Sequence, residues 1–323
     1  MLRIMNNMIR SFFLGGLMMD RRHFLMGAAA LALSARPGNA AAAYAAAAAK
    51  LARLSVSSST YRAHYDGRFS VAGALPRLSH RTLAAHVKQT FGISRIELWD
   101  QQFGPAGHSF AECRAIRAAA DAVGVQVVSV EVEDMPRLDA SDPDDRAQAV
   151  AEGKVWLEKA RVLGCTSMRF NVNRSRSEEV NREAAIEVLR EMADHGRRLG
   201  VVVLLENHGG ATANIAAVVE LVRTVNHQFV KAEPDWGAWV PPGDRYQAMQ
   251  SAMEVAHIVS AKGQLFDPDT YAHTSFDVAR LAREAEATGF MGVYSIELYN
   301  TPAPADTDRA VWSMIRAIAG EMR

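Results

Sequence analysis

Residues 200–210 read GVVVLLENHGG, and this stretch carries the signals that decide the fold. Gly200 stands where a helix would end, a run of valines and leucines follows, and Glu206, Asn207 and His208 close the run. Glycine is favoured just after a helix because it adopts a left-handed backbone conformation without strain. A short apolar run bounded by such signals is typical of a fully buried strand. The stretch therefore predicts a helix end, a buried strand and a polar strand terminus in direct succession.

The same unit recurs along the chain on both sides of this stretch. The predicted strands are 53–57, 95–99, 126–131, 167–171, 201–206, 229–233, 257–262 and 292–298. The amphipathic segments between and after them predict helices at 81–91, 110–123, 147–163, 182–199, 215–225, 245–253, 275–288 and 308–322. Glycine closes five of these helices, at Gly92, Gly124, Gly164, Gly200 and Gly289.

Eight strand–helix units over roughly 270 residues have the size of a (β/α)₈ barrel, so the sequence predicts a single TIM barrel domain over residues 52–323. The structural rival is an open, doubly wound sheet. No Gly-x-Gly-x-x-Gly follows the first predicted strand, and no second domain is evident, which favours the barrel.

Composition and charge narrow the function. The chain has 323 residues, 49% of them apolar, and its 36 basic and 36 acidic residues balance. Because binding to nucleic acid depends on excess positive charge, we expect no nucleic-acid partner. The two cysteines, Cys113 and Cys165, lie in separate regular segments, so they predict two buried thiols rather than a disulfide framework or a thiolate metal site.

The first forty residues have the layout of an export signal. Arg21-Arg22-His23-Phe24-Leu25 precedes a weakly apolar run that is too short to span a membrane, and small residues before Ala40 suit a signal peptidase. The pattern resembles a twin-arginine signal peptide over residues 1–40, followed by an alanine-rich linker over 41–51. It implies the twin-arginine export machinery as a partner, a periplasmic location, and no stable membrane insertion after processing.

The carboxyl ends of five predicted strands are polar. In a (β/α)₈ barrel the active site forms at these ends, because the loops that follow the strands converge over the barrel mouth. The five ends are Glu97–Asp100, Arg169–Asn171, Glu206–Gly210, Glu233–Gly237 and Ser295–Tyr299.

These endings resemble the xylose-isomerase-like superfamily of sugar isomerases and epimerases, over essentially the whole chain after the signal region. The most specific pieces are residues 203–210 at the fifth strand, 234–237 at the sixth and 295–297 at the eighth. The resemblance implies a (β/α)₈ barrel that acts on a small carbohydrate. It also implies a divalent metal held by Glu206, Asp235 and Glu297, an all-oxygen set that suits Mn²⁺ or Mg²⁺ better than Zn²⁺.

The seventh strand departs from the family pattern. Members often carry His-x-His-x-Lys there, whereas this chain reads His257-Ile258-Val259-Ser260-Ala261-Lys262. If Lys262 is aligned with the lysine of that pattern, Ser260 stands where the coordinating imidazole is expected. His257 is an odd number of residues from Ser260, so on a regular strand it points to the opposite face and is interpreted as structural. A metal-free site therefore stays open as an alternative, as does a nitrogen ligand supplied by His208.

Two carboxylates that flank a sugar carbon can remove a proton and return it, which is what isomerisation and epimerisation require. We expect Glu206 and Glu297 to be this pair. The other residues expected to line the substrate site are His208, Asn207, Lys262, Arg169, Trp99, Trp236, Glu97 and Ser260. Trp99, Trp236 and Trp239 are expected to cover the apolar face of a pyranose. For Trp99, Arg169 and Glu97 a purely structural role is an equal alternative.

Two other function classes stay open. One is a periplasmic lyase, hydratase or glycoside-cleaving enzyme on an oxidised sugar, in which the same proton abstraction ends in elimination. The other is a non-catalytic sugar-binding barrel with a degenerate metal site, marked by Ser260. The superfamily often forms dimers or tetramers, so a homo-oligomer is compatible with the resemblance.

Overall fold

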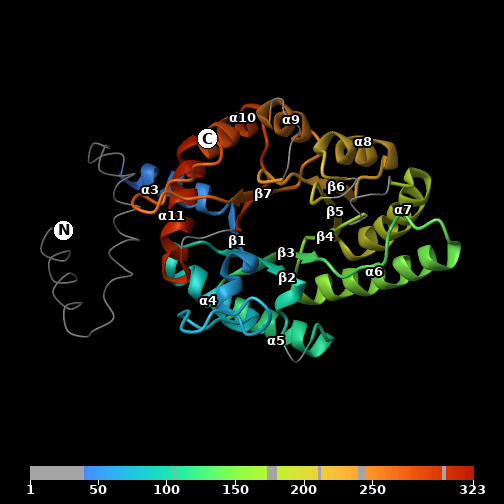
Figure 1. Cartoon of the computed structure of the whole chain (residues 1–323), viewed down its shortest axis with the longest axis horizontal. Coiled ribbons are helices and arrows are strands. Elements are labelled where there is room, and N and C mark those ends of the chain that lie inside the picture. Colours follow the sequence, from blue (N-terminus) through green and yellow to red (C-terminus); the bar gives the residue numbers. More distant parts are fainter. Residues whose placement is uncertain (1–39, 105–106, 173–179, 210–211, 239–244, 300–302) are drawn as a thin grey trace, which may run out of the picture.

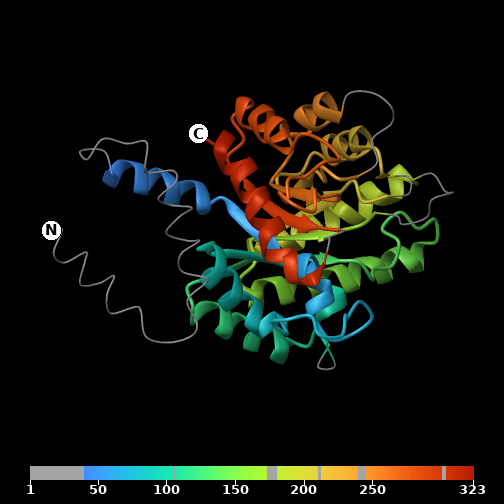
Figure 2. The same cartoon turned by 60° about the vertical axis from the view of Figure 1, so that its left-hand side comes forward.

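A computed structural model describes residues 40–104, 107–172, 180–209, 212–238, 245–299 and 303–323. Eight parallel strands form a nearly closed barrel, and helices ring it on the outside (Figures 1 and 2). The strands are β1 (Leu54–Ser57), β2 (Arg95–Trp99), β3 (Gln126–Val132), β4 (Ser167–Phe170), β5 (Val202–Glu206), β6 (Val230–Glu233), β7 (Ile258–Gly263) and β8 (Val293–Leu298). This confirms the predicted (β/α)₈ barrel.

The helices follow the predicted alternation. Those around the barrel are α4 (His80–Phe91), α5 (Phe110–Asp121), α6 (Pro143–Leu163), α7 (Arg182–Leu199), α8 (Ile215–Val225), α9 (Arg245–Ala252), α10 (Val278–Ala287) and α11 (Thr307–Glu321). Short 3₁₀ segments are η2 (Ser58–His64), η3 (Asp100–Gln102) and η5 (Pro304–Asp306). Gly200 ends α7 with φ of 72°, the left-handed conformation that its position in the opening stretch predicts.

The barrel closes between β6 and β7, where the two strands share only isolated bridges. The Trp236 N–H donates to the Ser260 carbonyl at 3.1 Å, and the Ser260 N–H donates to the Pro234 carbonyl at 3.0 Å. Asp235 and Ser260 are bridge partners across this junction. The closure therefore brings the polar end of β6 beside the middle of β7.

The core lies mainly between the barrel and its helices, where the outward face of each strand packs. Inside the barrel, a small apolar group of Val128, Leu204 and Ile258 fills the end at which the strands begin. Toward the carboxyl ends the interior is polar and charged, because inward positions there carry serines, acids, Arg169 and Lys262. The fold thus places a buried polar cluster under the barrel mouth.

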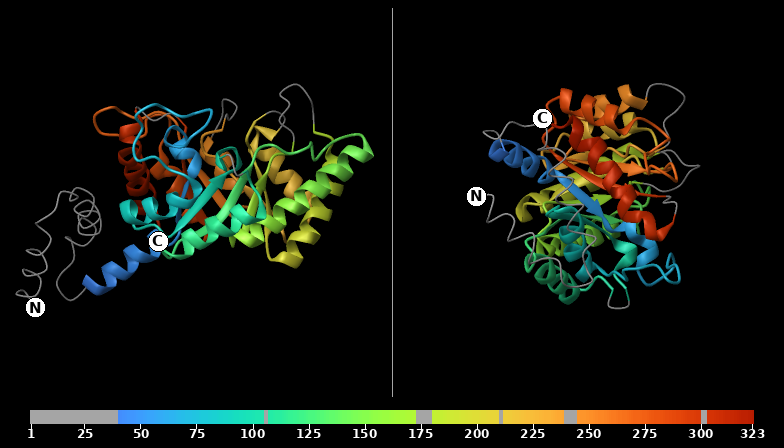
Figure 3. Two further views of the ribbon diagram at one scale, coloured as in Figure 1. Left: turned by 90° about the horizontal axis from the view of Figure 1, so that it is seen from below. Right: turned by 90° about the vertical axis from the view of Figure 1, so that its left-hand side faces the viewer.

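Outside the barrel, α3 (Ala40–Leu51) projects from the edge of the molecule before β1 (Figures 2 and 3). The segment predicted as an alanine-rich linker, 41–51, is helical, as alanine's high helix propensity favours. The predicted signal peptide up to Asn39 lies outside the described residues. No helix in the part of the chain that the structure describes is long and apolar enough to cross a membrane. Cys113 and Cys165 are both free and buried, as predicted.

Candidate active site

The ammonium group of Lys262 on β7 lies at the centre of the polar cluster. Its Nζ is 2.6 Å from Asp235 Oδ2, 3.2 Å from Glu297 Oε2 and 4.0 Å from Glu206 Oε1. Lys262 is only 7% exposed. Burial disfavours the charged amine, but the surrounding carboxylates, Asp235 first, hold the pKa of Lys262 well above its ordinary value. The structure therefore gathers the three acids that the sequence singled out around one buried cation.

Asp235 is fixed from both ends. The N–H of Gly237 donates to Asp235 Oδ1 at 2.7 Å, while Lys262 occupies Oδ2. Asn207 holds the Asp235 backbone: its Oδ1 accepts the Asp235 N–H at 2.7 Å, and its Nδ2 donates to the Asp235 carbonyl at 3.2 Å. From the sequence, Asn207 was predicted to bind a substrate hydroxyl. Here its amide is used in joining the ends of β5 and β6, so it positions Asp235.

Ser260 in the middle of β7 contacts Glu297 near the end of β8. The Ser260 hydroxyl donates to Glu297 Oε2 at 3.0 Å. Ser260 therefore faces the barrel interior, as predicted when Lys262 is aligned with the lysine of the family pattern. Glu297 is 8% exposed, and Arg62 approaches its other oxygen at 3.9 Å.

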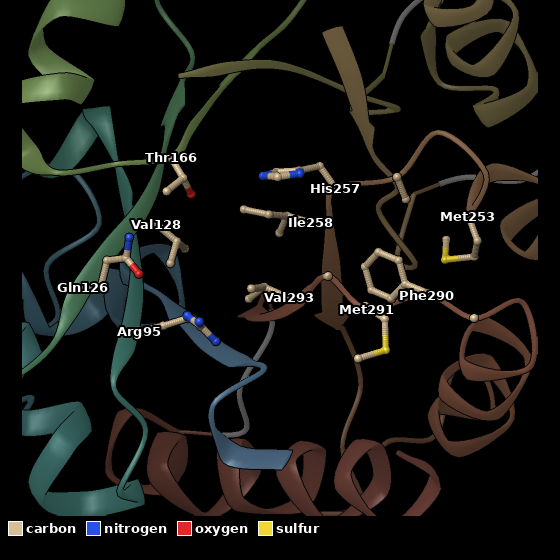
Figure 4. Close-up of a pocket in the computed structure, with 13 residues that line it drawn as sticks. Arg95, Gln126, Val128, Thr166, Met253, His257, Ile258, Phe290, Met291 and Val293 are labelled. Atoms are coloured by element: carbon tan, nitrogen blue, oxygen red, sulfur yellow. The ribbon is translucent and has the colours of Figure 1, made fainter. Parts of the chain in front are cut away.

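His257 lies just before β7, at the opposite end of the barrel. It lines a hollow of about 530 Å³ together with Arg95, Gln126 and Thr166 (Figure 4). Arg95 and Gln126 are the first residues of β2 and β3, so this hollow opens at the amino-terminal face of the barrel. The described residues that line it include no carboxylate, and catalytic groups of such barrels come from the other face. The hollow is not the candidate site.

Arg169 on β4 lies between the acids at the ends of its two neighbouring strands, β3 and β5. Its Nη1 donates to Glu133 at 2.7 Å, Nη2 lies 3.4 Å from Glu131, and Nε lies 3.1 Å from Glu206. The side chain is 2% exposed. Of the two roles considered for Arg169, the geometry favours the internal ion pairs, because the guanidinium faces carboxylates on all sides and not the mouth.

His208 is the most accessible polar side chain of the cluster, with a third of its surface exposed. Its Nδ1 lies 3.0 Å from Glu206 Oε2, and its Nε2 lies 3.7 Å from Glu133 Oε2. The negative charge of Glu206 raises the pKa of His208 above its ordinary value. Burial alone would raise the pKa of Glu206, but Arg169 and His208 hold it well below its usual range. The two side chains lie close enough to form an ion pair when His208 is protonated.

The ligand atoms of Glu206, His208 and Asp235 all lie within 4.8 Å of one another, so this group could hold a metal ion. It differs from the predicted set, because His208 takes the place of Glu297. Glu297 instead interacts with Ser260 and Lys262.

Below this cluster lies a second group of buried acids. Burial raises the pKa of Glu97 to about 7, and burial also raises the pKa of Glu131 and Glu233 well above the ordinary value. Oε1 of Glu97 and Oε2 of Glu233 have no hydrogen-bond partner among the described residues. Burial therefore favours the neutral form of these three acids.

The sequence prediction named Glu97 and placed Glu233 at a polar strand end without a role, but it missed Glu131 and Glu133 as buried acids of the barrel interior. The signal was present as a two-residue period, in Ser129-Val130-Glu131-Val132-Glu133 and in Glu233-Pro234-Asp235. Successive residues of a strand face opposite sides, so these acids share the inward face with Ser129 and Asp235.

The two tryptophans expected over the substrate have different places. Trp99 is half-buried at the end of β2, where its ring contacts Phe69 at 5.4 Å between centroids and the Arg62 guanidinium lies 5.8 Å from its ring centroid. Trp236 is fully buried and packs against Tyr294 on the outer side of the barrel. The expectation that Trp236 covers a sugar does not match this placement, because Asp235 takes the inward position and its neighbour must point outward. Trp239 lies outside the described residues.

Comparison with known proteins was made against families, curated proteins and solved structures. A model of the xylose isomerase-like TIM barrel family matches residues 86–316, well over half of the chain. No curated protein matches this chain.

Three solved structures resemble the chain over almost their whole length. 3-Keto-D-glucoside 4-epimerase from E. coli, in its apo form, is 13% identical, with 82% of this chain and 99% of that chain covered and a TM-score of 0.63. A xylose isomerase-like TIM barrel protein from Mycobacterium smegmatis in complex with magnesium is 16% identical, with 85% and 99% covered and a TM-score of 0.62. The IOLI protein with a bound zinc atom is 15% identical, with 84% and 99% covered and a TM-score of 0.64. Identities this low support the fold alone.

Proposed function

We propose, because this chain belongs to the xylose isomerase-like TIM barrel family, that it is a sugar isomerase or epimerase. The observation that most supports this function is the arrangement at the barrel mouth, where Glu297 and the Glu206–His208 pair flank the Lys262 ammonium. A structural relative that is an epimerase of a keto-glucoside agrees with this class of reaction.

Glu297 is assigned as the base. It takes a proton from the carbon beside the substrate's carbonyl, and the electrons of the broken C–H bond form the double bond of an enediolate. The negative charge then develops on the carbonyl oxygen, where a nearby cation stabilises it. Returning the proton to the former carbonyl carbon, while the hydroxyl proton of the other carbon moves to the former carbonyl oxygen, gives the isomer. Protonation of the original carbon on its opposite face by a second acid gives the epimer.

Glu206 has a different role in this proposal from the one expected for it. A carboxylate whose pKa is held well below its usual range is a poor proton acceptor at neutral pH. Its charge instead favours the protonated form of His208 by raising the pKa of the imidazole, and a third of the His208 side chain is exposed, so it can reach a substrate oxygen. We therefore assign proton donation to His208, with Glu206 as its fixed partner.

The all-oxygen metal set expected from the sequence does not fit the residues as they are arranged, whereas Glu206, His208 and Asp235 could hold an ion as a mixed set. Asp235 already accepts from Gly237 and Lys262, and Glu206 is engaged by Arg169 and His208. The predicted all-oxygen set for Mn²⁺ or Mg²⁺ would require the Lys262 ammonium to leave all three acids. No step of the proposed reaction is therefore assigned to a metal.

Trp99 suits the apolar face of a sugar ring, because it is half-exposed at the mouth and flanked by Phe69 and Arg62. Aromatic rings in this position offer a flat apolar surface beside polar groups.

The test is solvent exchange. Purified protein is incubated in D₂O with a panel of aldoses and ketoses, and deuterium incorporation at carbon is followed by NMR. Incorporation with formation of an isomer or epimer supports the proposal, whereas an enone-like absorbance would favour the lyase alternative. Absence of exchange for every sugar would reject isomerisation and epimerisation.

We also propose that the protein reaches the periplasm through the twin-arginine route, on the basis of residues 21–25. Changing Arg21 and Arg22 together to lysine is expected to abolish export, since the route reads the arginine pair and not its charge. Fractionation with immunodetection measures the share of protein in the periplasm. Arg36→Lys, in the same segment but outside the pair, is the matched control. Normal periplasmic levels of the double variant would refute the assignment.

A further inference from the structure

We propose that the ammonium group of Lys262 replaces the divalent ion in this barrel, as the resident cation that binds the substrate's carbonyl oxygen. The catalytic part rests on the proposed function, whereas the replacement of the metal is a property of the resting protein. Three independent features of the structure carry it.

The first feature is the position of the ammonium. Lys262 Nζ contacts Asp235 at 2.6 Å and Glu297 at 3.2 Å, and Glu206 lies 4.0 Å away. These are the acids that would ligate a metal by the family resemblance. An ion that bound all three would have to take the place of Nζ.

The second feature is the space made for the lysine stem. A Cβ placed on Gly237 would lie 2.7 Å from Cγ, 2.8 Å from Cδ and 2.9 Å from Cβ of Lys262, closer than such contacts allow. The stem therefore packs directly on the Gly237 backbone, whose N–H fixes the same Asp235 that the ammonium contacts. The residue after Trp236 is small because the lysine lies against it.

The third feature is Ser260. Its hydroxyl donates to Glu297 Oε2, the oxygen that also faces Lys262. A serine at this position supplies no imidazole nitrogen for a transition-metal ion, and here it supports the acid that the ammonium already pairs with.

These contacts set up a competition between the ammonium and a metal ion. A metal that displaced Lys262 would leave a buried ammonium without its carboxylates, and an uncompensated buried charge is strongly unfavourable. The gain from metal coordination is therefore offset by this loss, so the wild-type site should bind divalent ions weakly.

The lysine can also carry out the electrostatic part of the reaction. An ammonium has three N–H donors. Asp235 and Glu297 lie at hydrogen-bonding distance from Nζ, while Glu206 at 4.0 Å is beyond it, so with the residues that the structure describes one donor remains for a substrate oxygen. As Glu297 removes the carbon-bound proton and the electrons move into the enediolate, this N–H stabilises the charge that develops on oxygen. The proton, the electrons and the charge are thus accounted for without a metal.

The test is calorimetric titration of Mn²⁺ into metal-free, full-length protein, with thermal unfolding measured in parallel. Wild type is expected to show no binding at micromolar Mn²⁺ and no rise in melting temperature. Lys262→Met removes the competing cation and frees three acids, so its affinity is expected to rise roughly tenfold or more, about 1.4 kcal/mol per factor of ten. Adding Ser260→His to Lys262→Met is expected to increase the affinity further. Lys154→Met, which removes an exposed lysine paired with Glu191, is the matched control and should behave as wild type.

Stoichiometric micromolar binding by the wild type, with a higher melting temperature, would overturn the proposal. The wild-type titration alone decides this, even if the Lys262 variants fold poorly. Equal or weaker Mn²⁺ affinity in a folded Lys262→Met variant would also overturn it. None of these measurements uses a sugar, so a failure of deuterium exchange rejects the proposed reaction and leaves the assignment of the cation to be judged separately.

Discussion

Replacing Glu297 with glutamine is expected to lower the rate of C–H exchange by roughly 10²- to 10⁴-fold, the usual contribution of a positioned base. Glutamine keeps the volume of the side chain but cannot accept the proton. Ser260 can still donate to the amide oxygen, and Lys262 keeps its 2.6 Å contact with Asp235, so the barrel should stay folded. Deuterium incorporation by NMR measures the rate, and circular dichroism measures the fold.

The matched control is Glu254→Gln, which removes a negative charge from an exposed residue paired with Arg223 on the outer surface. It should exchange at the wild-type rate. A wild-type rate in the Glu297 variant would mean that Glu297 is not the base, and the proposed mechanism would then be wrong at its central step.

The largest expected loss of stability comes from Arg169→Met. Methionine fills part of the same space but leaves Glu131, Glu133 and Glu206 without their buried guanidinium. Removing one partner of a buried ionic network costs about 3–5 kcal/mol, because the remaining charge is uncompensated. Urea unfolding measures the difference in free energy from wild type. Arg197→Met, which breaks an exposed pair with Asp194, should cost no more than about 1 kcal/mol.

The loss should also depend on pH. In the wild type the pKa values of Glu133 and Glu206 are lowered: burial opposes the charge, but Arg169 outweighs it. Groups with lowered pKa values in the folded state stabilise it above their unfolded pKa, about 4.3 for glutamate, and that stability is lost as pH falls. The difference between wild type and Arg169→Met should therefore be largest near neutral pH and shrink below about pH 4. A difference that is constant over this range would show that Arg169 stabilises by packing and not by charge.

The barrel itself was predictable from local patterns. Each strand lies within two residues of its predicted bounds, because apolar runs and helix-ending glycines act over short stretches of chain. The inward direction of Ser260, and the outward direction of Trp236 beside Asp235, follow from the two-residue period of a strand. The expectation that Trp236 covers a sugar was wrong although the signal against it is local, in the alternation with Asp235.

The partners inside the barrel could not be predicted in the same way. Whether Arg169 meets Glu133 and Glu206, or whether Lys262 meets Asp235, depends on which strands become neighbours and how their registers align. The role of Asn207 depends on the junction of β5 and β6 in the same way.

The sequence by itself determined the eight strand–helix units, the polar barrel mouth and the identity of the acids that line it. Only the tertiary structure decided that these acids surround an ammonium and that His208 lies beside Glu206. The physical reason is range: backbone periodicity is set by neighbours a few residues apart, whereas charge pairing and burial are set by side chains that only the closed barrel brings within a few ångströms of one another.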